Sequence, residues 1–118
     1  MKAPIDLVAV RRNLETERSL LLERIAEFNQ RLAQPAEPSP EMLDLAESEA
    51  EQDLQATLLA ECQHQLAQIE AALEQLQANR YGLCTVCGQA IDPERLRILP
   101  YALTCMRCQQ RGEARTSG

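Results

Sequence analysis

The chain has 118 residues, with 18 Asp and Glu against 12 Lys and Arg and a formal net charge of −6. This length is typical of one domain and leaves little room for a large enzyme core. Hydrophobic residues make up 45% of the chain but aromatic residues only 3%, which favours helices packed on helices over a β-sandwich or barrel. The acidic balance argues against unaided nucleic-acid binding, which depends on Lys and Arg at phosphates. A protein partner is therefore the first expectation.

The N-terminal stretch does not look like a secretory signal, because it has no long apolar core and soon meets Arg11 and Arg12. Strictly apolar segments reach only three or four residues, as at Leu20 to Leu22. A membrane helix needs about 20 such residues. We therefore expect a cytoplasmic protein.

Two segments without Gly or Pro predict two long amphipathic helices, at about residues 6–33 and 41–80. Between them, residues 35–40 read PAEPSP, and three prolines in six residues end a helix. Both segments place apolar residues three and four positions apart. The first set is Leu7, Val10, Leu14, Leu21, Ile25, Phe28 and Leu32, and the second is Leu59, Cys62, Leu66, Ile69, Leu73 and Leu76.

The short connection between these helices predicts an antiparallel coiled-coil hairpin over residues 1–80, with a tip loop at 34–40. A zinc module with a short C-terminal helix and tail would follow at residues 81–118, giving an all-α fold. Apolar seams can also pair between chains, but the proline-rich break argues against a long dimeric rod. The hairpin interpretation predicts a monomer, which sedimentation can test.

Four of the five cysteines form two matched pairs, Cys84 with Cys87 and Cys105 with Cys108. Two C-x-x-C pairs at this separation are typical of a four-cysteine zinc site. Gly88 follows the first pair and can relax its turn. Two disulfides are disfavoured in a reducing cytosol, and a redox motif needs only one pair. We expect one structural Zn²⁺ per chain, because four thiolates leave no coordination position for substrate.

Nothing in the sequence supports catalysis. The fifth cysteine, Cys62, lies on the apolar seam, where cysteine usually packs as a small hydrophobe. The only histidine, His64, is two positions away and therefore on a different helix face. There is no Ser-His-Asp set and no glycine-rich phosphate loop, so we expect a protein that is not an enzyme.

The order of two helices with an acidic tip, then RYGLCTVCGQAIDPERLRILPYALTCMRC, resembles the DksA/TraR family of four-cysteine zinc-finger transcription regulators. The similar features are the aromatic-Gly-x-Cys start at Tyr81, the I-x-x-x-R-L segment from Ile91 and the proline at 100 before the second cysteine pair. The resemblance implies a coiled-coil arm that enters the secondary channel of bacterial RNA polymerase. The zinc module would rest on the rim outside. This chain would be a short member of the family.

The resemblance also assigns a function to the tip. Longer members carry an Asp-x-x-Asp-x-Ala motif there, and the matching residues are Glu41, Asp44 and Ala46. The first acid is Glu in place of Asp, which changes its reach. The alternative is that both acids only stabilise the first turn of their helix, where the helix dipole favours negative charge.

Two further expectations concern basic residues. The candidates for contact with an acidic channel rim are Arg95, Arg97, Arg107 and Arg111, which could equally be ordinary solvated surface. In the best-known members the alarmone ppGpp binds through basic residues whose matching positions here are Gln68, Arg95 and Gln109. Only one cation remains in that set, so we expect little or no ppGpp response through that site.

Three other functions have weaker support in the sequence. Direct nucleic-acid binding through the zinc module has weak support, because the segment from Tyr81 has only a small positive charge. A helical interaction module that does not act on polymerase is a second alternative. Transcript cleavage with a tip-bound Mg²⁺ is a third, but two carboxylates make a modest magnesium site.

Overall fold

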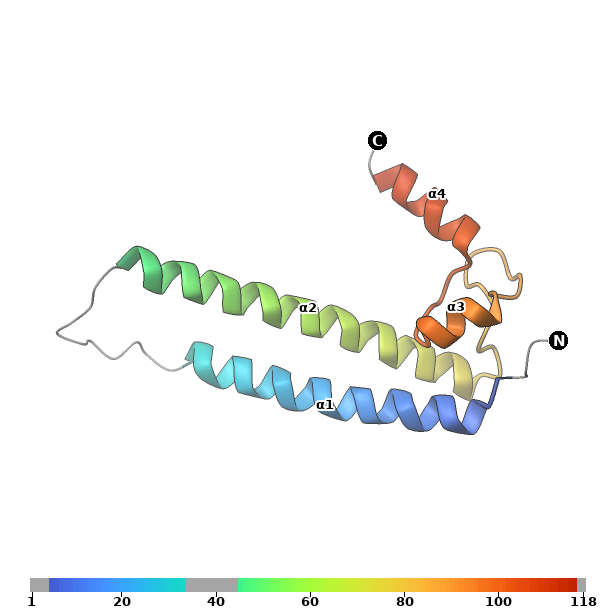
Figure 1. The fold of residues 1–118 in the computed structure, drawn as a ribbon, viewed down its shortest axis with the longest axis horizontal. Helices are drawn as coiled ribbons and strands as arrows, with labels where there is room; N and C mark the ends of the chain where they lie inside the picture. The colour runs from blue at the N-terminus through green and yellow to red at the C-terminus, as the bar shows by residue number, and fades with distance from the viewer. Residues whose placement is uncertain (1–4, 34–44, 117–118) are drawn as a thin grey trace. The chain divides into compact units, whose positions relative to one another are not determined.

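The protein is all-helical in the residues that the computed structural model describes, 5–33 and 45–116. Four helices follow one another in these ranges (Figure 1): α1 (Leu7–Ala33), α2 (Leu45–Gln77), α3 (Pro93–Ile98) and α4 (Met106–Thr116). These ranges contain no β-strand, only an isolated antiparallel bridge between Leu83 and Ala90. The predicted fold class is confirmed.

Helix α1 begins where the sequence predicts it. The carboxylate of Asp6 accepts hydrogen bonds from the amides of Val8 and Ala9, at 3.1 and 3.2 Å. This is the geometry of an N-cap, which satisfies amides that have no partner within the helix. The helix is 27 residues long and ends at Ala33, the predicted position.

Helix α2 ends three residues earlier than predicted, in a Schellman motif. Asn79 takes a left-handed backbone conformation with φ of 59°. The amide of Asn79 donates to the carbonyl of Leu76 at 3.2 Å, and that of Arg80 donates to the carbonyl of Gln75 at 2.8 Å. This pair of hydrogen bonds terminates the helix at Gln77, and Asn is one of the few residues that tolerate the left-handed position.

The contacts divide the chain into two compact units, which we call the finger unit (residues 1–18 and 67–118) and the arm unit (residues 19–66). The long helices α1 and α2 each contribute to both. In the arm unit the two helices lie antiparallel (Figure 1). Its buried hydrophobic side chains, among the described residues, are Leu21 and Cys62. The arm unit is therefore a thin two-helix structure.

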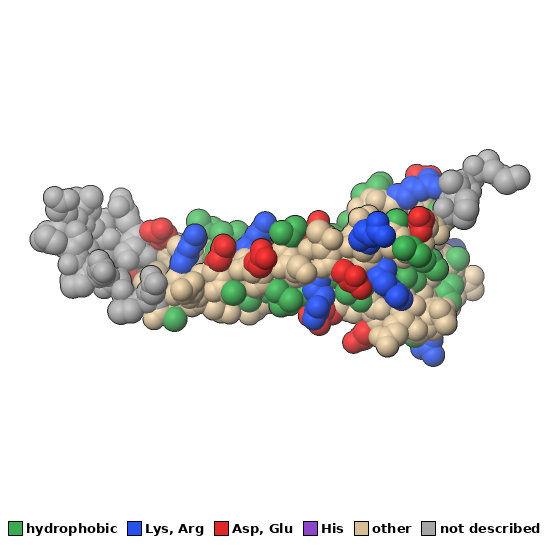
Figure 2. Space-filling view, turned by 90° about the horizontal axis from the view of Figure 1, so that it is seen from below, with side chains coloured by type: hydrophobic (Ala, Val, Ile, Leu, Met, Phe, Trp, Pro, Cys, Tyr) green, Lys and Arg blue, Asp and Glu red, His purple; other side chains and the backbone are tan. Residues whose placement is uncertain are grey.

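The finger unit has the larger core. Residues of the predicted seams, Leu14, Ile69 and Leu76, are buried in it, together with Ala72. A separate cluster in the same unit consists of Cys84, Ile91, Leu96 and Cys108, with Ile5 packed against it. Figure 2 shows that many hydrophobic side chains still reach the surface among charged ones. Leu7 is 52% exposed although the seam pattern includes it.

Two sequence expectations concern single positions. Cys62 is buried, as its packing interpretation requires, and His64 is exposed.

In the described part of the chain, no helix has both the length and the apolar character needed to cross a membrane.

Candidate metal centre

The first cysteine pair lies on a tight turn just after α2. The amide of Cys84 donates to the carbonyl of Gln89 at 2.7 Å, and the amide of Gly88 donates back to the carbonyl of Cys84 at 2.9 Å. Gly82 and Gly88 both have positive φ, 88° and 77°. Other residues rarely adopt this conformation, so the prediction that Gly88 relaxes the turn is confirmed.

The second pair lies at the start of α4. Cys105 directly precedes the helix and Cys108 is in its first turn. The amide of Gln109 donates to the carbonyl of Cys105 at 2.9 Å, which continues the helical pattern over the cysteine pair. The two pairs are also joined by their backbones, because the amide of Thr85 donates to the carbonyl of Leu103 at 2.8 Å.

These turns bring the four sulfurs together. The Sγ atoms of Cys84, Cys87, Cys105 and Cys108 all lie within 4.8 Å of one another. The Sγ atoms of Cys87 and Cys105 are 3.8 Å apart. A tetrahedron with Zn–S bonds of about 2.3 Å has edges of about 3.8 Å, whereas a disulfide bond is only about 2.05 Å long. The spacing therefore fits a metal held by four thiolates.

The pKa values of the cysteine thiols are also shifted by their surroundings, in ways that a bound cation would influence. Burial opposes ionisation of Cys84, but hydrogen bonds from backbone amides of both pairs outweigh it and lower the pKa of this thiol to about 6. The amide of Cys108 likewise lowers the pKa of Cys105. In contrast, burial and the neighbouring thiols raise the pKa of Cys108 to about 12. A bound divalent cation would favour all four thiolates together.

One side of the centre is packed and the other faces solvent. Cys84 and Cys108 are buried with Ile91 and Leu96, while Cys87 is exposed. Tyr81 and Ala102 pack against the same cluster, as does Ile5 from the N-terminal segment. Four sulfurs at this spacing would fill the tetrahedral shell of a bound zinc ion and would leave no open position for substrate, as in structural zinc sites.

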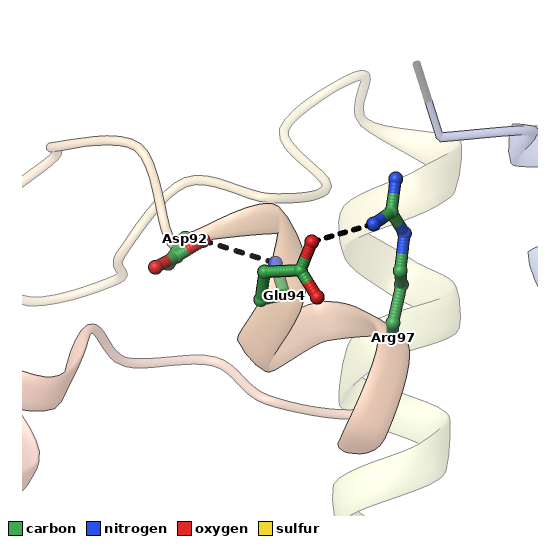
Figure 3. A network of polar contacts seen from close by, with 3 residues as sticks. All are labelled: Asp92, Glu94 and Arg97. Atoms are coloured by element: carbon green, nitrogen blue, oxygen red, sulfur yellow. Dashed lines mark hydrogen bonds and ion pairs between the residues drawn. The ribbon is translucent and has the colours of Figure 1, made fainter. Parts of the chain in front are cut away.

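Helix α3 lies between the two cysteine pairs in sequence. Its N-cap is Asp92, whose carboxylate accepts a hydrogen bond from the amide of Glu94 at 3.0 Å, and Pro93 occupies the first helical position (Figure 3). The guanidinium of Arg97 forms an ion pair with Glu94 at 2.6 Å (Figure 3). This helix was not predicted from the sequence, although Asp followed by Pro is a recognised start signal.

The other predicted site residues lie on the tip segment, on α3 and on α4. Glu41 and Asp44 lie outside the described residues, and Ala46 is in the first turn of α2, where its side chain is also outside the description. Arg107 and Arg111 are exposed on α4. Arg95 is half-buried and hydrogen-bonded within the finger unit, so its environment differs from that of the other arginines.

Comparison with known proteins places this architecture in a family. Residues 79–114 match the prokaryotic dksA/traR C4-type zinc finger. The chain resembles the solved structure of transcription factor DksA2 from Pseudomonas aeruginosa, with 32% sequence identity and a TM-score of 0.77. That alignment covers 95% of this chain and 86% of the Pseudomonas chain. The chain belongs to the DksA/TraR family.

Two further relatives of this DksA/TraR protein extend the comparison. An uncharacterized protein of Aquifex aeolicus (strain VF5) is 29% identical over 111 residues, which cover 92% of this chain and 76% of that protein. The solved structure of RNA polymerase binding protein and transcriptional regulator Dks from Chlamydia trachomatis is similar with 30% sequence identity and a TM-score of 0.46. The alignment covers 81% of this chain and 94% of the Chlamydia chain.

Membership of the DksA/TraR family and the sulfur geometry agree on the metal. The four cysteines are placed to bind one ion, and the family's finger is of the C4 zinc type. The cofactor prediction is therefore confirmed as one zinc ion in a closed four-thiolate shell. When bound, the ion supplies cross-linking between the two cysteine pairs, since structural zinc contributes directly to folding.

Proposed function

We propose that this protein is a cytoplasmic transcription regulator that binds bacterial RNA polymerase. In this proposal the α1–α2 arm enters the secondary channel with its acidic tip toward the active centre, and the zinc module rests on the rim. The observation that carries the proposal is the match to transcription factor DksA2 over 95% of this chain, which spans both long helices and the finger. The regulator would act as a monomer and not as an enzyme.

Exposed leucines on the arm unit support its insertion into a protein channel. Leu54 and Leu58 are one turn apart on α2, and they are 58% and 38% exposed. Leu20 and Leu22 on α1 are also exposed. A thin helix pair that leaves these leucines in solvent is a poor self-contained core, but it offers apolar surface to a protein channel.

The tip would carry the regulatory effect through Glu41, Asp44 and Ala46. Six acids and no base lie between residues 41 and 53, so this end of the arm has a strong negative charge. Such a charge can act on an active centre that works with cations and phosphates. The rival explanation, helix-dipole stabilisation by Glu41 and Asp44, predicts an effect on helix stability only.

The rim contact is best assigned to α4. Arg107 and Arg111 are four residues apart, so they share one face of the helix, and both are exposed. Among the described side chains neither takes part in an ion pair, whereas Arg97 is paired with Glu94. We therefore expect Arg107 and Arg111 to contribute more to polymerase binding than Arg97.

Little or no ppGpp response is expected through the finger side, because Gln68 and Gln109 carry no charge there.

The deciding experiment separates binding from regulation. Purified RNA polymerase is tested for binding of the wild-type protein and of Asp44→Asn, and the same proteins are tested in transcription from promoters that the wild type affects. Asp44→Asn should bind within about twofold of wild type but lose the transcriptional effect, because only the tip charge changes. Glu61→Gln, an exposed acid on α2 outside residues 41–53, is the control and should retain both.

Two results would reject parts of the proposal. If the wild-type protein does not bind polymerase, the assigned partner is wrong. If Asp44→Asn retains the full transcriptional effect, the tip assignment is wrong and the helix-dipole explanation is preferred. Adding ppGpp to the same assays tests the last expectation, which strong synergy would contradict.

A further inference from the structure

Arg95 connects α3 to the second cysteine pair. Its Nε–H donates a hydrogen bond to the backbone carbonyl of Thr104 at 3.2 Å. Its Nη1 atom lies 3.4 Å from Sδ of Met106, within hydrogen-bonding distance of a sulfur acceptor. Thr104 and Met106 are the residues directly before and after Cys105. One guanidinium group therefore contacts the chain on both sides of a zinc ligand.

The helix that carries Arg95 is itself well fixed. The neighbouring Leu96 is 4% exposed and belongs to the same buried cluster as Cys84 and Cys108. The backbone carbonyl of Arg95 accepts a hydrogen bond from the amide of Leu99 at 2.7 Å, which closes the C-terminal end of α3. Since its backbone is anchored in the cluster, the guanidinium can restrain Cys105 rather than follow it.

The contacts of Arg95 set it apart from the second arginine of α3. Arg97 pairs with Glu94 on the same helix, and their side chains are 42% and 53% exposed. An exposed pair three residues apart contributes little to stability. The partners of Arg95 lie nine and eleven residues away in sequence, and one of them is a backbone carbonyl of the segment that holds Cys105.

We propose that Arg95 is a positioning residue of the zinc centre, which holds Cys105 in place through Thr104 and Met106. Charge-assisted hydrogen bonds are stronger than neutral ones, and groups beyond the ligands that orient them are part of what sets metal affinity. A centre made of one Zn²⁺ and four thiolates would carry a net negative charge, which a nearby guanidinium would offset. Arg95 then serves the finger unit itself, in contrast to a role at the polymerase rim.

The first test compares zinc affinities. Competition with a chromophoric chelator of known zinc affinity gives the dissociation constant of wild type, Arg95→Met, Arg95→Lys and Arg97→Met. Arg95→Met keeps the apolar stem but loses the charge and the donors, and its affinity should fall about 10- to 100-fold. Arg95→Lys keeps the charge without the planar fork and should lie between wild type and Arg95→Met. Arg97→Met, from the same helix, should stay within about twofold of wild type.

The second test reports on the geometry of the site itself. Co²⁺ in place of zinc gives visible ligand-field bands whose positions depend on the arrangement of the four sulfurs. A substitution that only lowers global stability weakens metal binding without moving these bands. Arg95→Met should shift them, Arg95→Lys should restore them in part, and Arg97→Met should leave them at the wild-type positions.

The proposal is overturned if Arg95→Met binds zinc as tightly as wild type, if Arg97→Met loses as much affinity, or if the Co²⁺ bands of Arg95→Met do not move. Circular dichroism of the metal-loaded variants checks that the helices are retained. Should Arg95→Met fail to fold, Arg95→Lys decides, because a wild-type affinity and spectrum there would reject the need for the planar guanidinium. None of these measurements depends on RNA polymerase, so they stand apart from the proposed function.

Discussion

The hydroxyl of Tyr81 donates a hydrogen bond to the backbone carbonyl of Pro100 at 2.8 Å. These residues are 19 positions apart, one just before the first cysteine pair and the other just before the second. The ring of Tyr81 also packs against the buried cluster of Cys84, Ile91, Leu96 and Cys108. A single aromatic side chain therefore links the two approaches to the metal.

Replacement of Tyr81 by Phe should destabilise the zinc module by about 1 kcal/mol, because the ring is kept while one partly buried hydrogen bond is lost. Urea unfolding of the zinc-loaded protein, followed by circular dichroism, measures this difference. Tyr101→Phe is the matched control, since no hydrogen bond joins its hydroxyl to another described residue. Equal stabilities of wild type and Tyr81→Phe would show that the bond contributes nothing.

Because of the same tyrosine, the free energy of unfolding should fall as the pH rises into the alkaline range. Burial raises the pKa of Tyr81 above its ordinary value of 10.0. The folded protein thus holds this proton more tightly than the unfolded chain. The contribution is fully present below about pH 10 and is lost as the pH rises through the higher folded value. Absorbance at 295 nm in Tyr101→Phe reports Tyr81 alone, and a midpoint at or below 10 would contradict the effect of burial.

Much of this fold could be predicted from local patterns in the sequence. The absence of Gly and Pro marked both long helices, and α1 was predicted within one residue of its observed start at Leu7. The spacing of the four cysteines predicted the metal centre, because a C-x-x-C pair brings two sulfurs to one turn. These features depend on residues close together in sequence, which is why they could be found without a structure.

The features that were missed have two different causes. Asn79 and the Asp92-Pro93 pair carried local signals for the end of α2 and the start of α3. The packing of Ile5 on the finger cluster and the reach of Arg95 to Thr104 had no local signal. Both contacts arise only when distant segments meet in the folded finger unit, so periodicity and spacing could not predict them.

Two glycines should respond in opposite directions to substitution by alanine. Gly88 has φ of 77°, and an alanine Cβ at this position would have no neighbouring heavy atom within 4 Å, so Gly88→Ala meets only backbone strain. This should cost about 1 to 2 kcal/mol. Gly112 also has open space, but it lies within α4, where Gly112→Ala should stabilise by up to about 1 kcal/mol.

Unfolding of the zinc-loaded variants in urea, compared with wild type, measures both changes. Zinc affinity gives a second readout, since Gly88 directly follows the ligand Cys87 whereas Gly112 is four residues beyond Cys108. We expect weaker zinc binding in Gly88→Ala alone. If Gly88→Ala were as stable as wild type, the turn after the first cysteine pair would not need its left-handed conformation.

Removal of zinc should unfold the zinc module, residues 81–118, while the arm unit keeps its helices. Among the described residues, the buried cluster that supports the two cysteine pairs has four members, of which two, Cys84 and Cys108, are themselves ligands. So small a core cannot offset the entropy of ordering the chain around it, and metal-binding energy has to supply the difference. Helices of the arm unit do not contain a ligand, because residues 19–66 lie outside the cysteine pairs.

Hydrogen exchange of individual amides, before and after treatment with EDTA, locates the effect. The amide of Thr85, bonded to the carbonyl of Leu103 at 2.8 Å, and that of Gly88, bonded to Cys84 at 2.9 Å, should lose their protection. Amides of α1 and α2 near Leu21 and Cys62, the buried residues of the arm unit, should retain their protection. If Thr85 stays protected in protein shown to be metal-free by atomic emission, the backbone link between the two cysteine pairs forms without the ion, and zinc is not what holds the finger together.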